Sequence, residues 1–452
     1  MSTHVRRSPA RILTIALTLL APAGAFAATT AGRLGFTNTP LTRPEGDSEP
    51  AVAIGRDGTM AVTGLNWLTF GTNLWTGTFG STPTFRGIVD GALQKPGKRI
   101  FGGGDADVDL GATGTLHAST LIFLANPTLK AFQLGVSAIA CRDAGSPGFA
   151  ISTCTEQVID GAGADRQWIT SDGATVYISY HDAGNSSLVH VQRSDDDGFT
   201  WFRVGDPIPA QGAATGAATF NNDQGNLVAD PVTHNVYAIY AAGEPGIQKG
   251  TSAAFNNVFV SRSSDGGKTW KATLVFHAPL FTALNNVFPA LAVDPTSGAL
   301  HATWSDGVTV SYATSSDAGV TWSTAVAVNA APASTAVFPA IAARAGVVDL
   351  AYYGTTAASK DDPAAVWNVY LAQTANGGRS FTQSTVSTAP NHVGPICTEG
   401  TACAAGTRNL LDLFEVAIDP ATGRAAIVYA DDLLTTDSTG APLPQLVLAT
   451  QR

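Results

Sequence analysis

An eight-residue motif recurs along this chain, and such a repeat constrains the fold more than any single residue does. Residues 194–201, 263–270 and 315–322 share the pattern Ser-x-Asp-x-Gly-x-Thr-Trp, and residues 374–381 carry a degenerate fourth copy. The pattern predicts a hairpin turn in which the Asp accepts backbone N–H bonds, Gly takes a positive φ and Trp packs under neighbouring strands. We therefore expect Asp196, Asp265 and Asp317 to be structural, rather than catalytic or calcium-binding.

A longer unit surrounds this motif. Its clearest copy, residues 288–306, reads as a strand, a Gly-containing turn and a second strand ending in aromatic and acidic residues. Matching stretches begin near Glu49, Asp105, Arg166, Gln224, Phe338 and Leu413. Units of this size predict an all-β propeller with four-stranded blades, seven by count, or six if the first unit is not a full blade. The last unit lacks an outer strand, which residues 33–37 would supply to close the ring.

The motif copies resemble the Asp-box of the sialidase, or bacterial neuraminidase repeat, superfamily. The resemblance implies a propeller, six-bladed in sialidases themselves, and a hydrolytic activity on glycans. Family members also carry Arg-Ile-Pro or Arg-Leu-Pro in the first blade, three arginines that grip the substrate carboxylate, a Tyr–Glu nucleophile pair and an Asp acid/base. The nearest sequences here are Arg99-Ile100-Phe101 and Arg33-Leu34-Gly35. The chain thus departs from the family pattern at the active site.

The N-terminus indicates export. Arg6, Arg7 and Arg11 precede the apolar residues 12–23, and small residues follow at Ala25 and Ala27. We expect residues 1–27 to be a signal peptide and residues 28–452 to be a single propeller domain, secreted or periplasmic. After residue 27 the sequence contains no run of about 18 apolar residues, so it predicts no membrane-spanning helix. The net charge is −10 and the basic residues form no cluster, so the sequence lacks the basic surface that binds nucleic acid.

The four cysteines fall into two close pairs. In an exported chain they predict the disulfides Cys141–Cys154 and Cys397–Cys403. Zinc is the alternative, but the spacings match no common zinc pattern and no histidine is close to either pair. We expect no metal and no cofactor.

Candidate functional residues follow from propeller geometry. We call the mouth the face at which the inner strands begin and the second strands end. Aligning the units places Asp165, Asp223 and Asp412 at one equivalent position at this face, where His181 joins them as the candidate catalytic set. The candidate substrate-binding residues are Arg166, Arg408, Asp105, Tyr180, Trp304, Asp306, Tyr353 and Asp431. Any one of these aspartates could instead cap a turn.

Carboxylates, aromatic rings and two arginines around one mouth are suited to sugar recognition and to acid–base cleavage of a glycosidic bond. The sequence therefore favours a secreted glycoside hydrolase with an extracellular glycan as partner. A non-catalytic glycan- or protein-binding propeller is one alternative. A polysaccharide lyase is another, with His181 and a tyrosine abstracting a proton beside Arg166 or Arg408. Nothing in the sequence indicates the oligomeric state.

Overall fold

The computed structural model describes residues 34–66, 70–91, 100–126, 131–182, 184, 188–208, 222–243, 255–284 and 288–452. The predicted signal peptide lies outside these ranges. Within them the strands form seven antiparallel sheets of four or five strands. The prediction of an all-β, seven-bladed propeller is confirmed.

We number the blades along the chain and give their strands from the inner to the outer edge. Blade 1 contains β2 (Ser48–Ile54), β3 (Thr59–Leu65), β4 (Thr72–Thr78) and β5 (Thr84–Ile88). Blade 2 contains β7 (Ala106–Leu110), β8 (Leu116–Asn126), β9 (Ala131–Cys141) and β10 (Thr155–Asp160), with β6 (Ile100–Phe101) also on β8. Blade 3 contains β11 (Gly163–Asp172), β12 (Thr175–Asp182), β13 (Val189–Ser194) and β14 (Phe202–Arg203). Blade 4 contains β15 (Asn222–Ala229), β16 (Val236–Ala242), β17 (Asn257–Ser263) and β18 (Lys271–His277).

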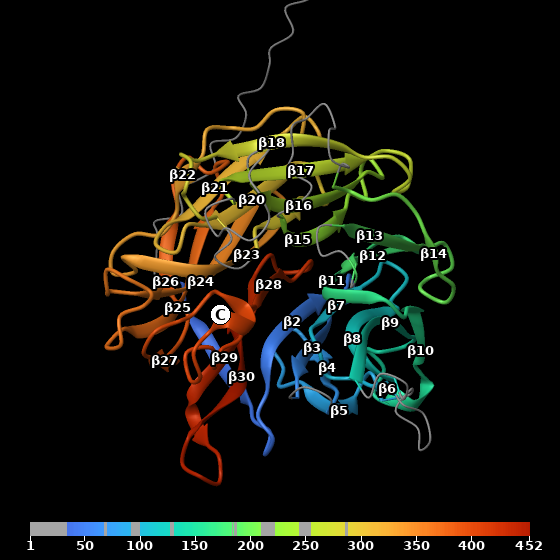
Figure 1. The fold of residues 1–452 in the computed structure, drawn as a ribbon, viewed down its shortest axis with the longest axis horizontal. Coiled ribbons are helices and arrows are strands. Elements are labelled where there is room, and N and C mark those ends of the chain that lie inside the picture. The colour runs from blue at the N-terminus through green and yellow to red at the C-terminus, as the bar shows by residue number, and fades with distance from the viewer. Residues whose placement is uncertain are drawn as a thin grey trace, which may run out of the picture. The chain divides into compact units, whose positions relative to one another are not determined.

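The remaining blades follow the same order. Blade 5 contains β19 (Ala290–Val293), β20 (Leu300–Ser305), β21 (Val310–Ser315) and β22 (Val326–Ala327). Blade 6 contains β23 (Thr335–Arg344), β24 (Val347–Thr355), β25 (Val366–Thr374) and β26 (Thr382–Thr385), with β27 (His392–Val393) also on β25. Blade 7 contains β28 (Glu415–Ile418), β29 (Ala425–Thr436), β30 (Pro442–Gln451) and β1 (Phe36–Leu41). Two short 3₁₀ helices are η1 (Ile151–Thr153) and η3 (Gly400–Ala402). In Figure 1 the inner strands surround the axis of the ring.

The hydrophobic core lies between the blades. Seven clusters of buried apolar side chains each join two neighbouring sheets, as where Val52 and Met60 of blade 1 pack with Val428 and Leu446 of blade 7. Such burial contributes about 25 cal/mol per Å² of apolar surface. A blade is therefore stabilised mainly by the two blades beside it.

The N-terminal strand closes the ring. β1 pairs with β30 over six residues, from Phe36 opposite Gln451 to Leu41 opposite Leu446. It thus supplies the outermost strand of a blade whose other three strands come from the C-terminus, as the sequence predicts, although the strand is Phe36–Leu41 rather than residues 33–37. Pairing the two ends of the chain leaves neither terminal sheet incomplete.

The repeated motif forms the turn between the third and fourth strands of blades 3, 4 and 5. In blade 4, Asp265 accepts hydrogen bonds from the Ser263 hydroxyl (2.8 Å), the Thr269 N–H (2.9 Å) and the Thr269 hydroxyl (2.6 Å). Asp196 and Asp317 make the same three bonds in blades 3 and 5. All three carboxylates are therefore engaged within their own turns.

These turns lie on the edge opposite the mouth. In blade 3, Ser194 at the start of the turn pairs with Val176, next to the hairpin that follows the inner strand. At the other edge of the same sheet, Ala164 pairs with His181. A motif aspartate and a mouth residue are thus separated by the length of a strand.

Each turn also packs against the preceding blade. Its last glycine, at φ between 77° and 85°, faces a ring of that blade: Gly198 faces His117, Gly267 faces Tyr177, Gly319 faces Tyr237 and Gly378 faces Tyr312. A Cβ at Gly378 would collide with the Tyr312 ring. Glycine is therefore required here both by the backbone conformation and by the close approach.

In the contact between blades 2 and 3 the ring is that of His117 instead of a tyrosine, and this ring can carry a charge. Its Nε2 lies 3.1 Å from Oδ1 of Asp197, and Asp197 also accepts the hydroxyls of Thr113 (2.8 Å) and Thr115 (2.5 Å). Burial opposes a charge on His117, but Asp109 and Asp197 outweigh burial and raise its pKa to about 9. The contact between blades 2 and 3 therefore contains an ion pair between the buried His117 and the partly exposed Asp197.

Both disulfides, Cys141–Cys154 and Cys397–Cys403, are present. They are compatible with an extracytoplasmic protein. Among the described residues, no helix has the length and apolar character that a membrane crossing requires.

Candidate functional site at the mouth of the propeller

Irregular pairing at the mouth end of the inner strands brings side chains toward the axis. The register between first and second strands shifts in blades 1, 3, 4 and 6, between Ser48 and Ala51 in the first case. Within these shifts Glu49 and Phe338 adopt φ values of 45° and 55°. A bulge re-aims the residues that it contains, so Glu49, Asp165 and Arg166 leave the regular alternation of their strands.

Five acidic residues from five blades meet at this end of the axis. They are Glu49, Asp105, Asp165, Asp223 and Asp412. The N–H of Asp412 donates to Oε1 of Glu49 (3.2 Å), and Asp105 shares hydrogen bonds with the carboxyl groups of Glu49 and Asp165. Asp223 lies close enough to Asp412 for their charges to interact. The three aspartates placed at one repeat position by sequence thus share one site, joined by Asp105.

The pKa values of these acidic residues are shifted in different directions. Burial and the charge of Asp412 raise the pKa of Asp223 to about 7. The charge of Asp105 raises the pKa of Asp165, and burial raises that of Glu49. Burial acts in the same direction on Asp105, but the hydrogen bond from Asp165 and the charge of Arg166 leave its pKa lowered. The pKa shifts therefore favour ionisation of Asp105 and protonation of Glu49 and Asp165.

The two arginines have different surroundings. Arg408 makes a two-pronged ion pair with Asp412, in which Nε lies 2.9 Å from Oδ1. Arg166 is 2% exposed, and its guanidinium lies 4.1 Å from the centre of the Trp168 ring. One guanidinium is thus occupied by a carboxylate and the other is covered by protein.

His181 lies behind Asp165. Its Nδ1 donates to the main-chain oxygen of Asp165 (2.7 Å), and its Nε2 lies 3.1 Å from Oδ1 of Asn222. Burial lowers the pKa of His181, so the ring is neutral near pH 7. The structure places it as a support for the Asp165 backbone rather than in the open mouth.

Five of the candidate substrate-binding residues lie apart from the acidic group. Tyr180 is fully buried and its hydroxyl donates to Asp160 (2.8 Å), while Trp304 stacks on Phe276 with ring centres 5.0 Å apart. Tyr353, also buried, accepts the N–H of Ala430. Their rings are thus not accessible for stacking on a sugar, and this corrects the sequence-based expectation. A position at the end of a strand does not say to which side of the sheet a side chain points.

The two remaining aspartates are engaged in their own loops. Asp306 accepts the N–H groups of Val308 and Thr309, at 3.0 and 2.7 Å. Asp431 is 6% exposed and accepts the N–H of Leu433 (2.9 Å), and burial raises its pKa to about 6. Both therefore stabilise local turns.

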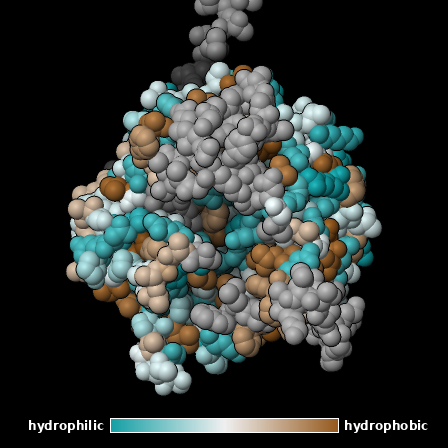
Figure 2. All heavy atoms as spheres, viewed as in Figure 1, coloured by the Kyte–Doolittle hydropathy of each residue, from teal (hydrophilic) through white to brown (hydrophobic). Residues whose placement is uncertain are grey.

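A second layer of polar side chains, which the sequence analysis missed, lies two or three residues further along the inner strands. Asp107 accepts the N–H of Ile169 in the next blade (2.8 Å), and Glu415 accepts that of Val52 (2.9 Å). Asn226 makes the equivalent contact from blade 4 to blade 5 (2.7 Å). The signal was present, because these three positions align in the repeat. The residues connect neighbouring inner strands and line an axial cavity of about 340 Å³, and Figure 2 shows the molecule hollowed near the middle of the ring.

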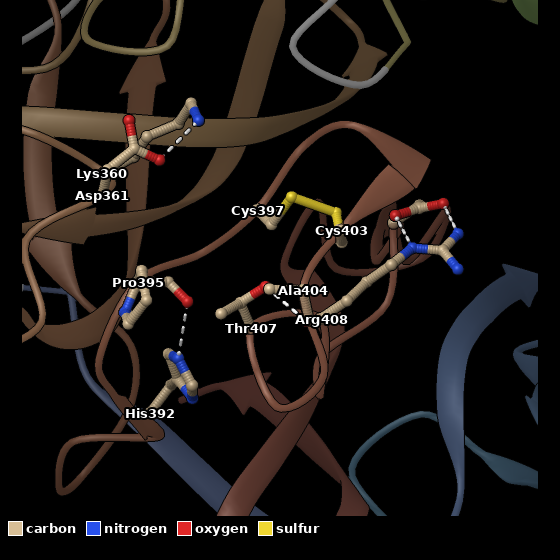
Figure 3. The surroundings of a disulfide bond; sticks show 10 residues. Lys360, Asp361, His392, Pro395, Cys397, Cys403, Ala404, Thr407 and Arg408 are labelled. Carbon is tan, nitrogen blue, oxygen red and sulfur yellow. Dashed lines mark hydrogen bonds and ion pairs between the residues drawn. A yellow bond between two sulfur atoms is a disulfide. The ribbon is translucent and has the colours of Figure 1, made fainter. Parts of the chain in front are cut away.

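The loop that carries Arg408 and Asp412 is held in several places. The Cys397–Cys403 disulfide closes its first part, and the N–H of Cys397 donates to the main-chain oxygen of Thr407 (2.9 Å). Figure 3 shows this disulfide and Arg408 on the same loop.

Blade 7 anchors this loop through a buried network. Oδ2 of Asp432 lies 2.9 Å from Nδ1 of His392 and accepts the side-chain amide of Asn409 at the same distance. Both His392 and Asp432 are at most 3% exposed. Asn409 is next to Arg408 in the chain, so the network limits where the arginine can lie.

No protein-family model matches the chain, and no curated protein matches it in sequence. Among solved structures, it is similar to a protein of unknown function from Dyadobacter fermentans, with 12% identity over 92% of this chain and 100% of that chain and a TM-score of 0.50. It is also similar to an ulvan lyase of a polysaccharide lyase family, with 12% identity over 91% of this chain and 95% of that chain and a TM-score of 0.51. The chain shares their fold.

A sialidase from Trypanosoma rangeli is a further structural neighbour, with 12% identity over 92% of this chain and 60% of that chain and a TM-score of 0.45. Sialidases are thus among the structural neighbours, at low identity. Among the described residues, no group of three or more His, Cys, Asp or Glu side chains is arranged to hold a metal ion.

Proposed function

We propose that the protein is a secreted glycoside hydrolase that cleaves an extracellular glycan at the mouth of the propeller. The supporting observation is the neighbouring pair of Asp223 and Asp412. Asp223 has a pKa raised to about 7 and can carry a proton near neutral pH. Asp412 is partly buried, which raises its pKa, but its ion pair with Arg408 opposes that effect and favours the carboxylate.

Two carboxyl groups in different protonation states are what glycosidic cleavage requires. In the proposed reaction Asp223 donates its proton to the leaving oxygen as the bond to the sugar breaks. Asp412 then acts as the base for water or as the nucleophile. The distance between the two carboxyl groups in a substrate complex would decide between these two roles.

The geometry is less suited to lysis or to sialoside cleavage. A lyase needs a base beside a cation that neutralises a uronate, whereas both nitrogens of His181 are engaged and Arg166 is covered. A grip on a sialic acid carboxylate needs free guanidinium groups, and Arg408 is already paired with Asp412.

A product screen tests the proposal. Mature protein is incubated with neutral, amino-sugar, uronate and sialic acid glycans, and the release of reducing ends and the ultraviolet absorbance of unsaturated products are followed. We expect new reducing ends without unsaturated products. Unsaturated products would indicate a lyase, and saturable binding without any product would indicate a glycan-binding propeller.

A further inference from the structure

Glu49, Asp105 and Asp165, here called the acidic triad, form a part of the mouth that the hydrolytic pair does not use. They come from blades 1, 2 and 3, and their carboxyl groups contact one another through Asp105. Asp165 is exposed and Asp105 partly exposed, whereas Glu49 is only 3% exposed. A ligand in the mouth can therefore reach two of the three directly.

One oxygen of the triad lacks the donor that a buried carboxylate oxygen normally has. Oε2 of Glu49 is buried, and among the described residues it meets no backbone N–H, amide, guanidinium or hydroxyl donor; its neighbours are carboxyl groups. The nearest cation, Arg166, has a buried Nε without a partner in the described chain, and its guanidinium lies over Trp168. The triad thus faces two cations, of which Arg166 lies over Trp168 and Arg408 is paired with Asp412.

We infer that the acidic triad is a binding subsite for the protonated amine of an amino-sugar glycan. An ammonium group carries three donors and no acceptor, which matches carboxyl groups that have acceptors to spare. Hydrogen bonds from an ammonium to carboxylates are charge-assisted and about twice as strong as neutral ones. A carboxylated or sulfated sugar would instead meet like charges, with no free guanidinium to receive it.

A metal ion is the other cation that such a cluster could attract. The lack of a metal-binding arrangement among the described residues favours the organic ammonium.

Binding of the ammonium should also change the protonation of the triad. The charge of the ligand replaces the protons shared within the triad, so protons are released on binding. The affinity then rises with pH until the amine itself loses its proton.

This inference deepens the proposed function, and binding measurements separate the two. Isothermal titration calorimetry compares a fully deacetylated glucosamine hexamer, the N-acetylated hexamer and a uronate oligomer, in buffers of different ionisation enthalpy. We expect the amine to bind at least tenfold more tightly than the N-acetylated hexamer, with release of protons. Tight amine binding without turnover would support the amine subsite and overturn the proposed hydrolysis. Cleavage of neutral glycans without a preference for the amine would support hydrolysis and overturn the amine subsite.

Variants locate the effect. Asp165→Asn is exposed and is expected to fold, and Asp105→Asn removes the ionised member of the triad. Each should reduce the preference for the amine at least tenfold while leaving binding of the N-acetylated hexamer within twofold. Asp195→Asn, on a turn at the opposite edge, is the matched control for loss of a carboxylate. It should change neither the preference for the amine nor the binding of the N-acetylated hexamer. An undiminished preference in both triad variants, or displacement of the amine by millimolar calcium chloride, would overturn the inference.

Discussion

At the scale of single residues, the position of a carboxylate in the ring decides what it can do. Asp223 and Asp265 belong to the same blade, yet one meets other carboxyl groups at the mouth and the other is bonded within a turn at the opposite edge. Burial, together with the charge of Asp412, raises the pKa of Asp223 to about 7. Hydrogen bonds from the hydroxyl and the N–H of Thr269 lower the pKa of Asp265 to about 2. Of these two carboxylates, only Asp223 is therefore expected to take part in acid–base chemistry.

We predict that Asp223→Asn and Asp412→Asn each reduce glycan turnover at least about a hundredfold, the usual range for loss of an acid or base. Thermal unfolding should change little, because neither side chain belongs to the hydrophobic core. If Asp223 is the acid, turnover by the parent protein falls as pH rises above about 7, where Asp223 loses its proton. Full activity in Asp223→Asn, with Asp361→Asn as the surface control, would contradict this assignment.

The motif aspartates should affect stability without affecting the mouth. Asp265→Ala and Asp317→Ala remove acceptors from their turns and should lower the melting temperature, with ligand binding intact. The folded pKa of each is about 2, below the ordinary 3.8. Their contribution is therefore present above pH 4 and is lost as the pH falls toward 2. Melting curves from pH 6 to pH 2 should show parent and variants converging at the acid end; a constant difference would argue against the hydrogen bonds as its cause.

At the scale of elements, the contacts between blades are as specific as those within them. A turn glycine of one blade meets a ring of the blade before it, and polar side chains of inner strands accept N–H groups of the next blade. These contacts place the mouth residues of neighbouring blades at fixed positions, because each inner strand is tied to the strand beside it.

His117 should make the contact between blades 2 and 3 sensitive to pH. Its pKa is raised from 6.5 to about 9 in the folded protein, so its contribution is complete below pH 6.5 and is lost as the pH rises through 9. The difference corresponds to about 3 kcal/mol at most. His117→Tyr, which copies the residue at the equivalent place in blades 3 and 4, should remove this dependence. Urea unfolding at pH 6, 7.5 and 9 measures it, and an equal loss of stability in both proteins would show that His117 is not the cause.

The Cys397–Cys403 disulfide should matter more for the site than for the fold. In the chain-entropy model, replacing both cysteines by serine costs about 2 kcal/mol, because the closed loop is short. Turnover should fall at least tenfold, since the loop carries Arg408 and Asp412. The double Cys141→Ser and Cys154→Ser variant is the matched control, because this disulfide lies at the edge away from the mouth. Equal losses of turnover in the two double variants would show that the loop has no special role.

At the scale of the whole molecule, stability and site geometry both depend on closure of the ring. Blade 7 combines one strand from the N-terminus with three from the C-terminus and packs against blade 1. The loop with Arg408 and Asp412 enters this blade, while Glu49 belongs to blade 1. The site thus spans the joint between the two ends of the chain.

Removal of β1 should therefore loosen the ring. A chain starting at residue 42 loses six paired residues and the buried side chains of Phe36 and Leu41. Loss of these two side chains alone costs about 3–6 kcal/mol. We expect a lower melting temperature and loss of glycan binding, measured against a chain that starts at residue 34. Unchanged melting would show that blades 7 and 1 remain joined without β1.

The repeat in the sequence was sufficient to predict the propeller, the number of blades and the strand that closes it, because turn chemistry and strand alternation are local properties. The same alignment placed Asp165, Asp223 and Asp412 at one face, and the structure brings them into one acidic group. Only the tertiary structure decided that Tyr180, Trp304 and Tyr353 point into the interior and that Arg166 lies over Trp168. Those outcomes depend on register shifts and on packing between blades, which join residues far apart in the chain. The contact of Glu49 with Asp412 has the same origin, since it forms only when the two ends of the chain meet.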